Sequence, residues 1–208
     1  MRCVERFAAP APRCVRCALR VPAGTLTCGA CLAAQPPFDA ATSALDYAWP
    51  WNGLIRRFKF HAALDLAPAL AQRIADAWQA GTHEAPQWLL PVPLAHERLR
   101  ERGYNQAWEL ARRLAPRVGG QASPHLLVRL RDTPHQIALP PERRAANVRG
   151  AFAVAPRHGG ALRDAHVMLV DDVMTTGATV AEIAMVLKHA GARRVTVAVL
   201  ARTPRPGD

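Results

Sequence analysis

The sequence predicts an α/β protein in which a mostly parallel sheet, covered by helices on both faces, follows a small cysteine-rich module. Continuous apolar runs alternate with helical patterns, and such runs are typical of parallel strands that are buried on both faces. Half of the 208 residues are apolar, which is enough to build a sizeable core. The predicted strands are residues 88–92, 126–130, 151–154, 167–170 and 195–201.

The module, residues 1–37 with its linker, contains the pairs Cys14-x-x-Cys17 and Cys28-x-x-Cys31, separated by ten residues. Each pair can supply half of a tetrahedral zinc site, and four sulfur ligands leave no position for water, so this zinc would be structural. The module has too few apolar residues to fold on a core of its own, so metal binding would stabilise it. Unligated buried thiols or a redox pair are the alternatives. Cys3 has no partner at this spacing and is predicted to be a spectator.

Residues 38–208 are predicted to form the main domain, which begins with a helical segment over about 38–85. Leu54, Ile55 and Phe58 fall on one face of a first helix, and a second helix continues the apolar spacing. Lys59 and His61 follow on the first helix or at its end. Packing at the surface is favoured over a chemical role for both.

Residues 166–179 join an apolar strand, two adjacent carboxylates and a turn of small residues. Ligands of open α/β sheets lie beyond the carboxyl ends of the strands. N–H groups at the start of the next helix, predicted over 177–189, can bind an anion, and Gly177 allows close approach or a positive φ. Carboxylates can accept hydrogen bonds from vicinal sugar hydroxyls, directly or through Mg²⁺. The candidate residues are Asp171, Asp172, Thr175, Thr176, Gly177, Ala178 and Thr179.

This segment resembles the phosphoribosyl-pyrophosphate (PRPP) signature of type I phosphoribosyltransferases, which residues 170–179 match without a gap. The alternative is a strand, an Asx turn and a capped helix without a ligand. Adjacent carboxylates suit a mere turn poorly, because their charges repel unless a ligand or cation is present. The resemblance implies the type I phosphoribosyltransferase fold and makes PRPP the expected ligand.

A second block resembles the ComF family through a Pro-Val-Pro strand end, spaced arginines and an aromatic-Asn-Gln-Ala sequence that leads into a helix over about 105–114. The resemblance implies that the turn formed by Val92, Pro93 and Leu94 holds pyrophosphate. Arg98 and Arg102 would add charge-assisted hydrogen bonds to phosphate oxygens. A solvated helix face is the alternative for these two arginines.

A third block, residues 129–152, follows ComF spacings and is interrupted by Pro134, Pro140 and Pro141. We expect a loop or hairpin for part of its length, acting as a lid that keeps water from a ribosyl centre. The resemblance implies a catalytic role for Arg144 together with Asp171 and Asp172. Turn chemistry is the alternative for its polar residues, Thr133, Gln136 and Asn147.

Two functions are compatible with these patterns. The first is an Mg²⁺-dependent PRPP-binding transferase that acts by positioning and charge stabilisation, with an unidentified acceptor. The second, which the ComF resemblance implies through competence and DNA uptake, is a protein that binds single-stranded DNA or the DNA-uptake helicase. Binding that weakens steeply with salt would favour the second.

Charge alone does not separate these functions. The net charge is +11, and residues 98–149 contain 11 arginines and no lysine against four acidic residues. A polyanionic partner would explain this excess, and so would the codon usage of a GC-rich genome. No apolar run reaches membrane length and no secretory signal is recognisable, so we expect a cytoplasmic protein without membrane insertion.

Overall fold

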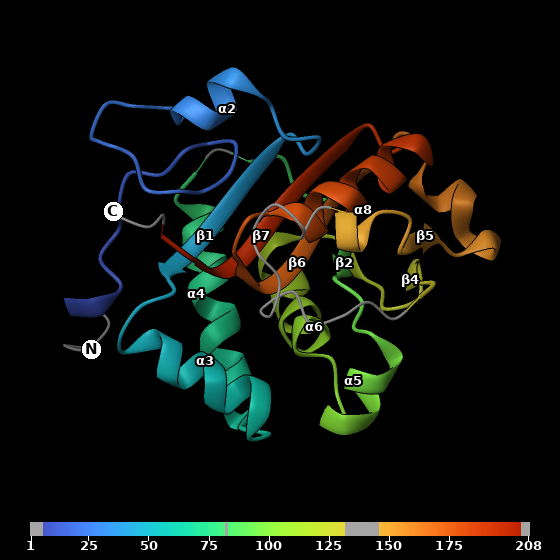
Figure 1. Ribbon diagram of the computed structural model, residues 1–208, viewed down its shortest axis with the longest axis horizontal. Coiled ribbons are helices and arrows are strands. Elements are labelled where there is room, and N and C mark those ends of the chain that lie inside the picture. Colours follow the sequence, from blue (N-terminus) through green and yellow to red (C-terminus); the bar gives the residue numbers. More distant parts are fainter. Residues whose placement is uncertain (1–5, 82, 132–145, 205–208) are drawn as a thin grey trace.

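The computed structural model describes residues 6–81, 83–131 and 146–204. Its centre is a five-stranded sheet with the order β1-β7-β6-β2-β3, and every neighbouring pair in this sheet is parallel (Figure 1). The predicted parallel sheet is therefore confirmed. The strands are β1 (Ala40–Asp46), β2 (Trp88–Pro91), β3 (Gln121–Ala122), β6 (His166–Met174) and β7 (Arg194–Arg202).

Helices cover both faces of the sheet. Successive residues of a strand point to opposite sides, and in these strands both sets are apolar, so both faces need cover. On one face, Met168 and Ala198 pack in a cluster with α3 (Trp51–Phe60), α4 (Ala67–Gln79) and α6 (Gln106–Val118). On the other face, Leu169 and Val197 pack in a cluster with α8 (Ala178–His189). Shorter helical elements outside the cysteine-rich module are α5 (His96–Arg102), η1 (Leu64–Leu66) and η3 (Pro156–Leu162). Within the described residues, no helix has both the length and the apolar composition needed to cross a membrane.

Two of the predicted strands do not belong to the parallel sheet. They form β4 (Leu127–Arg129) and β5 (Phe152–Val154), an antiparallel pair in a separate small sheet. Conversely, β1 and β3 were not predicted. The exposure of β1 alternates along its length, and its small and polar residues give no continuous apolar run. Hydropathy alone does not distinguish strands of this kind from loops.

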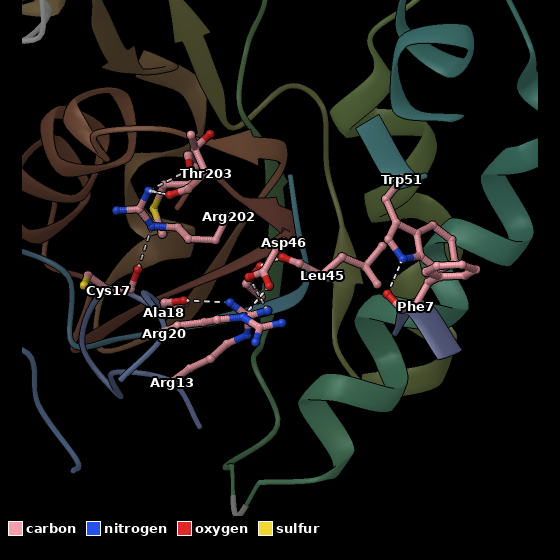
Figure 2. Close-up of polar contacts among 12 residues, drawn as sticks. Phe7, Arg13, Cys17, Ala18, Arg20, Leu45, Asp46, Trp51, Arg202 and Thr203 are labelled. Atoms are coloured by element: carbon pink, nitrogen blue, oxygen red, sulfur yellow. Dashed lines mark hydrogen bonds and ion pairs between the residues drawn. The ribbon is translucent and has the colours of Figure 1, made fainter. Parts of the chain in front are cut away.

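The four-cysteine module, which we define as residues 6–37, lies along the edge strand β1 and reaches the carboxyl ends of β1 and β7 (Figure 1). It contains the short helix α2 (Gly29–Ala33) and an isolated bridge between Arg13 and Arg20. Both arginines pair with Asp46 at the end of β1 (Figure 2). Ala18 is fully buried and joins the core cluster beneath α8. The module and the sheet therefore share apolar as well as ionic contacts.

Candidate functional site

Two of the motifs meet at the carboxyl ends of β2 and β6. Pro91 is aligned with Val170 across the two strands, and the amide of Val92 donates to the carbonyl of Val170 at 2.9 Å. The 92–94 turn therefore leaves the sheet beside the point where the acidic pair begins. Val92 is buried, whereas Pro93 and Leu94 are partly exposed.

The acidic pair lies on β6 itself, because this strand continues four residues beyond its predicted end at residue 170. Asp172 is 2% exposed and Asp171 is partly exposed. The amide of Asp172 donates to Oδ1 of Asp171 at 2.9 Å, which fixes the two carboxylates relative to each other.

Lys59 of α3 forms an ion pair with Asp172, with 2.9 Å between Nζ and Oδ2. Burial would raise the pKa of Asp172, but the charge and hydrogen bond of Lys59 outweigh this and lower the pKa. Burial would likewise lower the pKa of Lys59, whereas the charges of Asp172 and Asp171 raise it. Lys59 thus belongs to the acidic site. The sequence signal was weak: Lys59 is one of only two lysines in the chain, on a helix that also carries Arg56 and Arg57.

Asp171 has the opposite electrostatic character. Burial, and next the charge of Asp172, raise the pKa of Asp171 well above its usual value of 3.8. The cation on Lys59 counteracts this only in part. Asp171 is therefore the carboxylate that gains most from a hydroxyl donor or a divalent cation.

The 175–179 turn leads from β6 into α8. Gly177 has φ +84°, the left-handed conformation that glycine adopts without a steric penalty, which agrees with the role predicted for it. Thr176 accepts a hydrogen bond from the amide of Ala178 through its hydroxyl oxygen, at 3.3 Å. Thr175 and Thr176 are exposed, and Ala178 begins a helix of 12 residues. The start of α8 is thus accessible to an anion, which the helix dipole would favour.

Arg98 and Arg102 lie one turn apart on α5. Arg102 donates to the side-chain oxygen of Gln106 and lies over the ring of Phe60, 5.3 Å from its centroid. Burial lowers the pKa of Arg102, although the charges of Asp172 and Asp171 act in the opposite direction. Arg102 thus lies within electrostatic reach of the acidic pair.

Asn105 joins the 92–94 turn to α6. Its side-chain oxygen accepts from the amides of Ala107 and Trp108 and so caps the helix, while its Nδ2 donates to the carbonyl of Val92 at 3.1 Å. Tyr104, the preceding residue, donates to the carbonyl of Phe58 on α3. The aromatic-Asn sequence therefore holds the turn and the Lys59 helix together. Neither residue has such a role in the sequence-based prediction, where both belong only to the family pattern.

Arg144 and most of the third block, including Thr133 and Gln136, lie outside the described residues. The ends of that block are described, and Arg129 pairs with Phe152 where β4 and β5 meet. The amide of Gly150 donates to Glu182 of α8 at 2.6 Å. Both ends of the block are therefore attached to the main domain.

The four cysteines of the module are brought together. Their sulfur atoms all lie within 4.8 Å of one another, and none forms a disulfide. Burial would raise the pKa of Cys14, but backbone N–H groups lower it to about 7, whereas burial and the neighbouring sulfurs raise the pKa of Cys31. Four sulfur donors this close together form a set that fits a tetrahedral metal ion such as zinc, because a cation would stabilise their thiolate forms.

This chain is similar to a known domain family and to several named bacterial proteins. Residues 107–207 match the phosphoribosyl transferase domain family. The DNA utilization protein YhgH of Salmonella typhimurium is 35% identical over 195 residues, which cover 91% of this chain and 84% of that protein. Competence protein F of Haemophilus influenzae is 33% identical over 195 residues, covering 92% and 85%.

Two further proteins match a smaller part of this chain. Competence protein ComFC of Bacillus subtilis is 28% identical over 125 residues, which cover 60% of this chain and 48% of that protein. The solved glutamine PRPP amidotransferase of B. subtilis has a TM-score of 0.42 and 21% identity, covering 64% of this chain and 26% of that one. This chain is 33–35% identical to YhgH and competence protein F over most of its length, and it contains the matched domain and the cysteine cluster. It therefore belongs to the ComF family and has a type I phosphoribosyltransferase fold.

Proposed function

We propose that this protein binds PRPP with Mg²⁺ and transfers its ribosyl phosphate to an acceptor that remains to be identified. One observation carries the proposal: the acidic pair, the 175–179 turn and the 92–94 turn converge at the carboxyl ends of two adjacent strands. An acidic pair suits ribose hydroxyls, and the two turns suit phosphate groups on either side of it.

The residues divide the substrate between them. Asp171 and Asp172 accept from the ribose hydroxyls, and Asp172 is held in its charged form by Lys59. The N–H groups and hydroxyls of the 175–179 turn bind the phosphate ester. The 92–94 turn binds pyrophosphate, with Arg98 and Arg102 supplying positive charge.

Asp171 is also the residue that fits Mg²⁺, because it is a hard oxygen donor whose charge Lys59 offsets only in part. Bound Mg²⁺ supplies charge neutralisation for the pyrophosphate group. Catalysis by the chain itself is positioning and stabilisation of the departing pyrophosphate as the bond to the ribose anomeric carbon breaks. Arg144 and the third block are proposed to assist by excluding water.

Calorimetric titration of PRPP with Mg²⁺ tests this function. We expect saturable binding that weakens by at least about 100-fold in the Asp171→Asn, Asp172→Asn double variant, since two charge-assisted contacts are lost. The control is Asp65→Asn with Asp164→Asn, which makes the same charge change at exposed positions. Absence of binding by folded wild-type protein would contradict the proposal. A search for the acceptor follows only if binding is found.

A second candidate function is binding of single-stranded DNA. A cavity of about 700 Å³ lies between α5, α6 and β4, next to the 92–94 turn. Tyr104, Trp108 and His125 line it, and Arg129 and Arg131 lie among them. Aromatic faces beside arginines suit stacked bases and a phosphate backbone. The names of the relatives, which refer to DNA utilization and competence, point in the same direction.

Fluorescence anisotropy with labelled oligo-dT at several salt concentrations tests this alternative. Binding at this cavity is expected to weaken steeply with salt and to weaken further in Arg129→Ala, Arg131→Ala. Arg163→Ala, Arg193→Ala is the matched control, since neither of these arginines lines the cavity. If both double variants weaken oligo-dT binding equally, the binding depends on the net charge of the protein and not on this cavity. We place either function in the cytoplasm, where a reducing environment keeps the four thiols available to a metal.

A further inference from the structure

Arg202 is a buried cation at the end of β7, where the four-cysteine module meets the 175–179 turn. It is 5% exposed. Its Nε donates to the carbonyl of Cys17 at 3.0 Å, and its Nη1 donates to the carbonyl of Met174 at 2.9 Å. Nη1 also donates to the carbonyl of Thr175. It donates to the carbonyl of Thr203 as well (Figure 2). One side chain thus connects a metal-ligand residue with the start of the turn.

The contacts of Arg202 orient two peptide planes. In a trans peptide the C=O and the following N–H point in opposite directions. Because the carbonyls of Met174 and Thr175 point toward Arg202, the amides of Thr175 and Thr176 point away from it. These two amides belong to the turn that we propose binds phosphate. Hydrogen bonds from a charged donor are stronger than neutral ones, so these contacts favour this orientation.

The same guanidinium would respond to the state of the cysteine site. Four thiolates around one Zn²⁺ would carry a net charge of −2, which favours a nearby cation. A bound metal would also fix the backbone of the Cys14–Cys17 knuckle and hence the carbonyl of Cys17, which accepts from Arg202. Loss of the metal would remove both influences on the position of Arg202.

A second arginine provides an internal comparison. Arg13 donates to the carbonyl of Ala18, one residue after Cys17, at 3.2 Å and pairs with Asp46 at 2.9 Å (Figure 2). It joins the module to the sheet as Arg202 does, but its partner on the sheet, Asp46, lies at the end of β1 and not on the 175–179 turn. Replacing Arg13 therefore loosens the module without touching the turn.

We propose that Arg202 is a positioning residue that couples metal occupancy of the four-cysteine site to the conformation of the 175–179 turn. The coupling concerns the turn itself and holds whatever ligand the turn binds. Its consequence for PRPP affinity rests on the proposed function. By linkage, metal binding and ligand binding then strengthen each other by the same factor.

Amide hydrogen exchange of residues 174–179, measured without PRPP, tests the coupling directly. We expect faster exchange in Arg202→Met and in metal-depleted wild type, unchanged exchange in Arg13→Ala, and an intermediate rate in Arg202→Lys. Exchange of the central β6 and β7 amides reports whether each sample is folded. If Arg202→Met does not fold, Arg202→Lys carries the test.

The decisive comparison combines the two changes. Metal depletion should accelerate exchange of residues 174–179 much less in Arg202→Met than in wild type, because the connection is already broken. Equal acceleration in both proteins, or wild-type exchange in the Arg202 variants, would overturn the coupling.

A second measurement separates this inference from the proposed function. Where wild type binds PRPP, saturating PRPP should slow zinc transfer to a chelator in wild type and Arg13→Ala but not in Arg202→Met. Coupled exchange without PRPP binding would reject the proposed function and leave the coupling intact. PRPP binding with uncoupled exchange would reject the coupling alone.

Discussion

Asp171 and Asp172 are neighbours in the chain, yet their pKa values move in opposite directions. Burial acts to raise both pKa values, and Lys59, which contacts Asp172, outweighs burial at Asp172 but not at Asp171. The sequence predicted the carboxyl pair and its position after an apolar strand. It could not distinguish the two carboxylates, because the cation arrives from a helix more than a hundred residues earlier.

Asp171→Asn is expected to raise stability while it weakens PRPP binding. A carboxyl group whose folded pKa is raised costs stability as the pH rises above its unfolded value of 3.8, and the full cost is present above its folded pKa. Asparagine removes this cost, on the order of 1 kcal/mol at neutral pH. Denaturant unfolding as a function of pH measures it. The gain should vanish toward pH 3.8, and a variant that is less stable than wild type at neutral pH would contradict this account.

Lys59→Met is expected to destabilise the protein by about 3 kcal/mol, because a buried carboxylate loses its cation. The lowered pKa of Asp172 contributes stability above its unfolded value of 3.8, and this contribution is lost as the pH falls through the folded pKa. Lys59→Met should abolish this stability contribution of Asp172 at every pH. The matched control is Lys188→Met, which breaks the half-exposed ion pair with Asp39 and should cost less than about 1 kcal/mol. Equal losses in urea unfolding would show that Lys59 acts only as a surface group.

At the scale of elements, local patterns and long-range pairing contributed differently. Helix α8 and the positive φ of Gly177 followed from the sequence, because small residues and an apolar stripe are local signals. The extension of β6 through Met174 did not. Its polar residues gain backbone partners from β7, where Asp171 aligns with Val199 and Met174 with Arg202. The same limitation hid β1, whose pairing with β7 joins residues far apart in the chain.

Asn105 is expected to affect both helix stability and ligand affinity, and two substitutions separate these effects. Asn105→Ala removes the cap of α6 and should cost about 1 kcal/mol. Asn105→Ser keeps a capping oxygen but loses the Nδ2 contact with Val92, so most of the stability should remain while PRPP binding weakens. Thermal unfolding and calorimetry measure the two quantities. Full PRPP affinity in Asn105→Ser would show that the contact with Val92 does not position the turn.

At the scale of the whole molecule, the four-cysteine module and the sheet are joined by buried as well as ionic contacts. Ala18 packs with Phe38 in the main core, although we predict a domain boundary between residues 37 and 38. Several arginines are also bound inside the molecule. Arg112 and Arg113 pair with Glu109, and Arg13 pairs with Asp46. Such pairs are already balanced in the net charge of +11, whereas Arg202 is a cation that is only 5% exposed and is therefore not accessible to a polyanion.

Zinc removal is expected to lower the melting temperature of the whole chain by about 5 °C or more, because the module shares its contacts with the sheet. Metal analysis should find one zinc per chain in wild type and none in Cys14→Ser, Cys28→Ser. Cys3→Ser is the control and should retain both the zinc and the melting temperature. Retention of zinc by the double variant would contradict the four-sulfur site.

The sequence by itself determined the parallel α/β class, the four-cysteine grouping and the acidic strand-to-helix segment, because each depends on residues close together in the chain. Only the tertiary structure decided that Lys59 pairs with Asp172, that Asn105 holds the 92–94 turn and that Arg202 connects the module to the 175–179 turn. These contacts join segments whose proximity is set by strand order and helix packing. Local residue patterns carry no record of which distant partner will satisfy a buried charge or carbonyl.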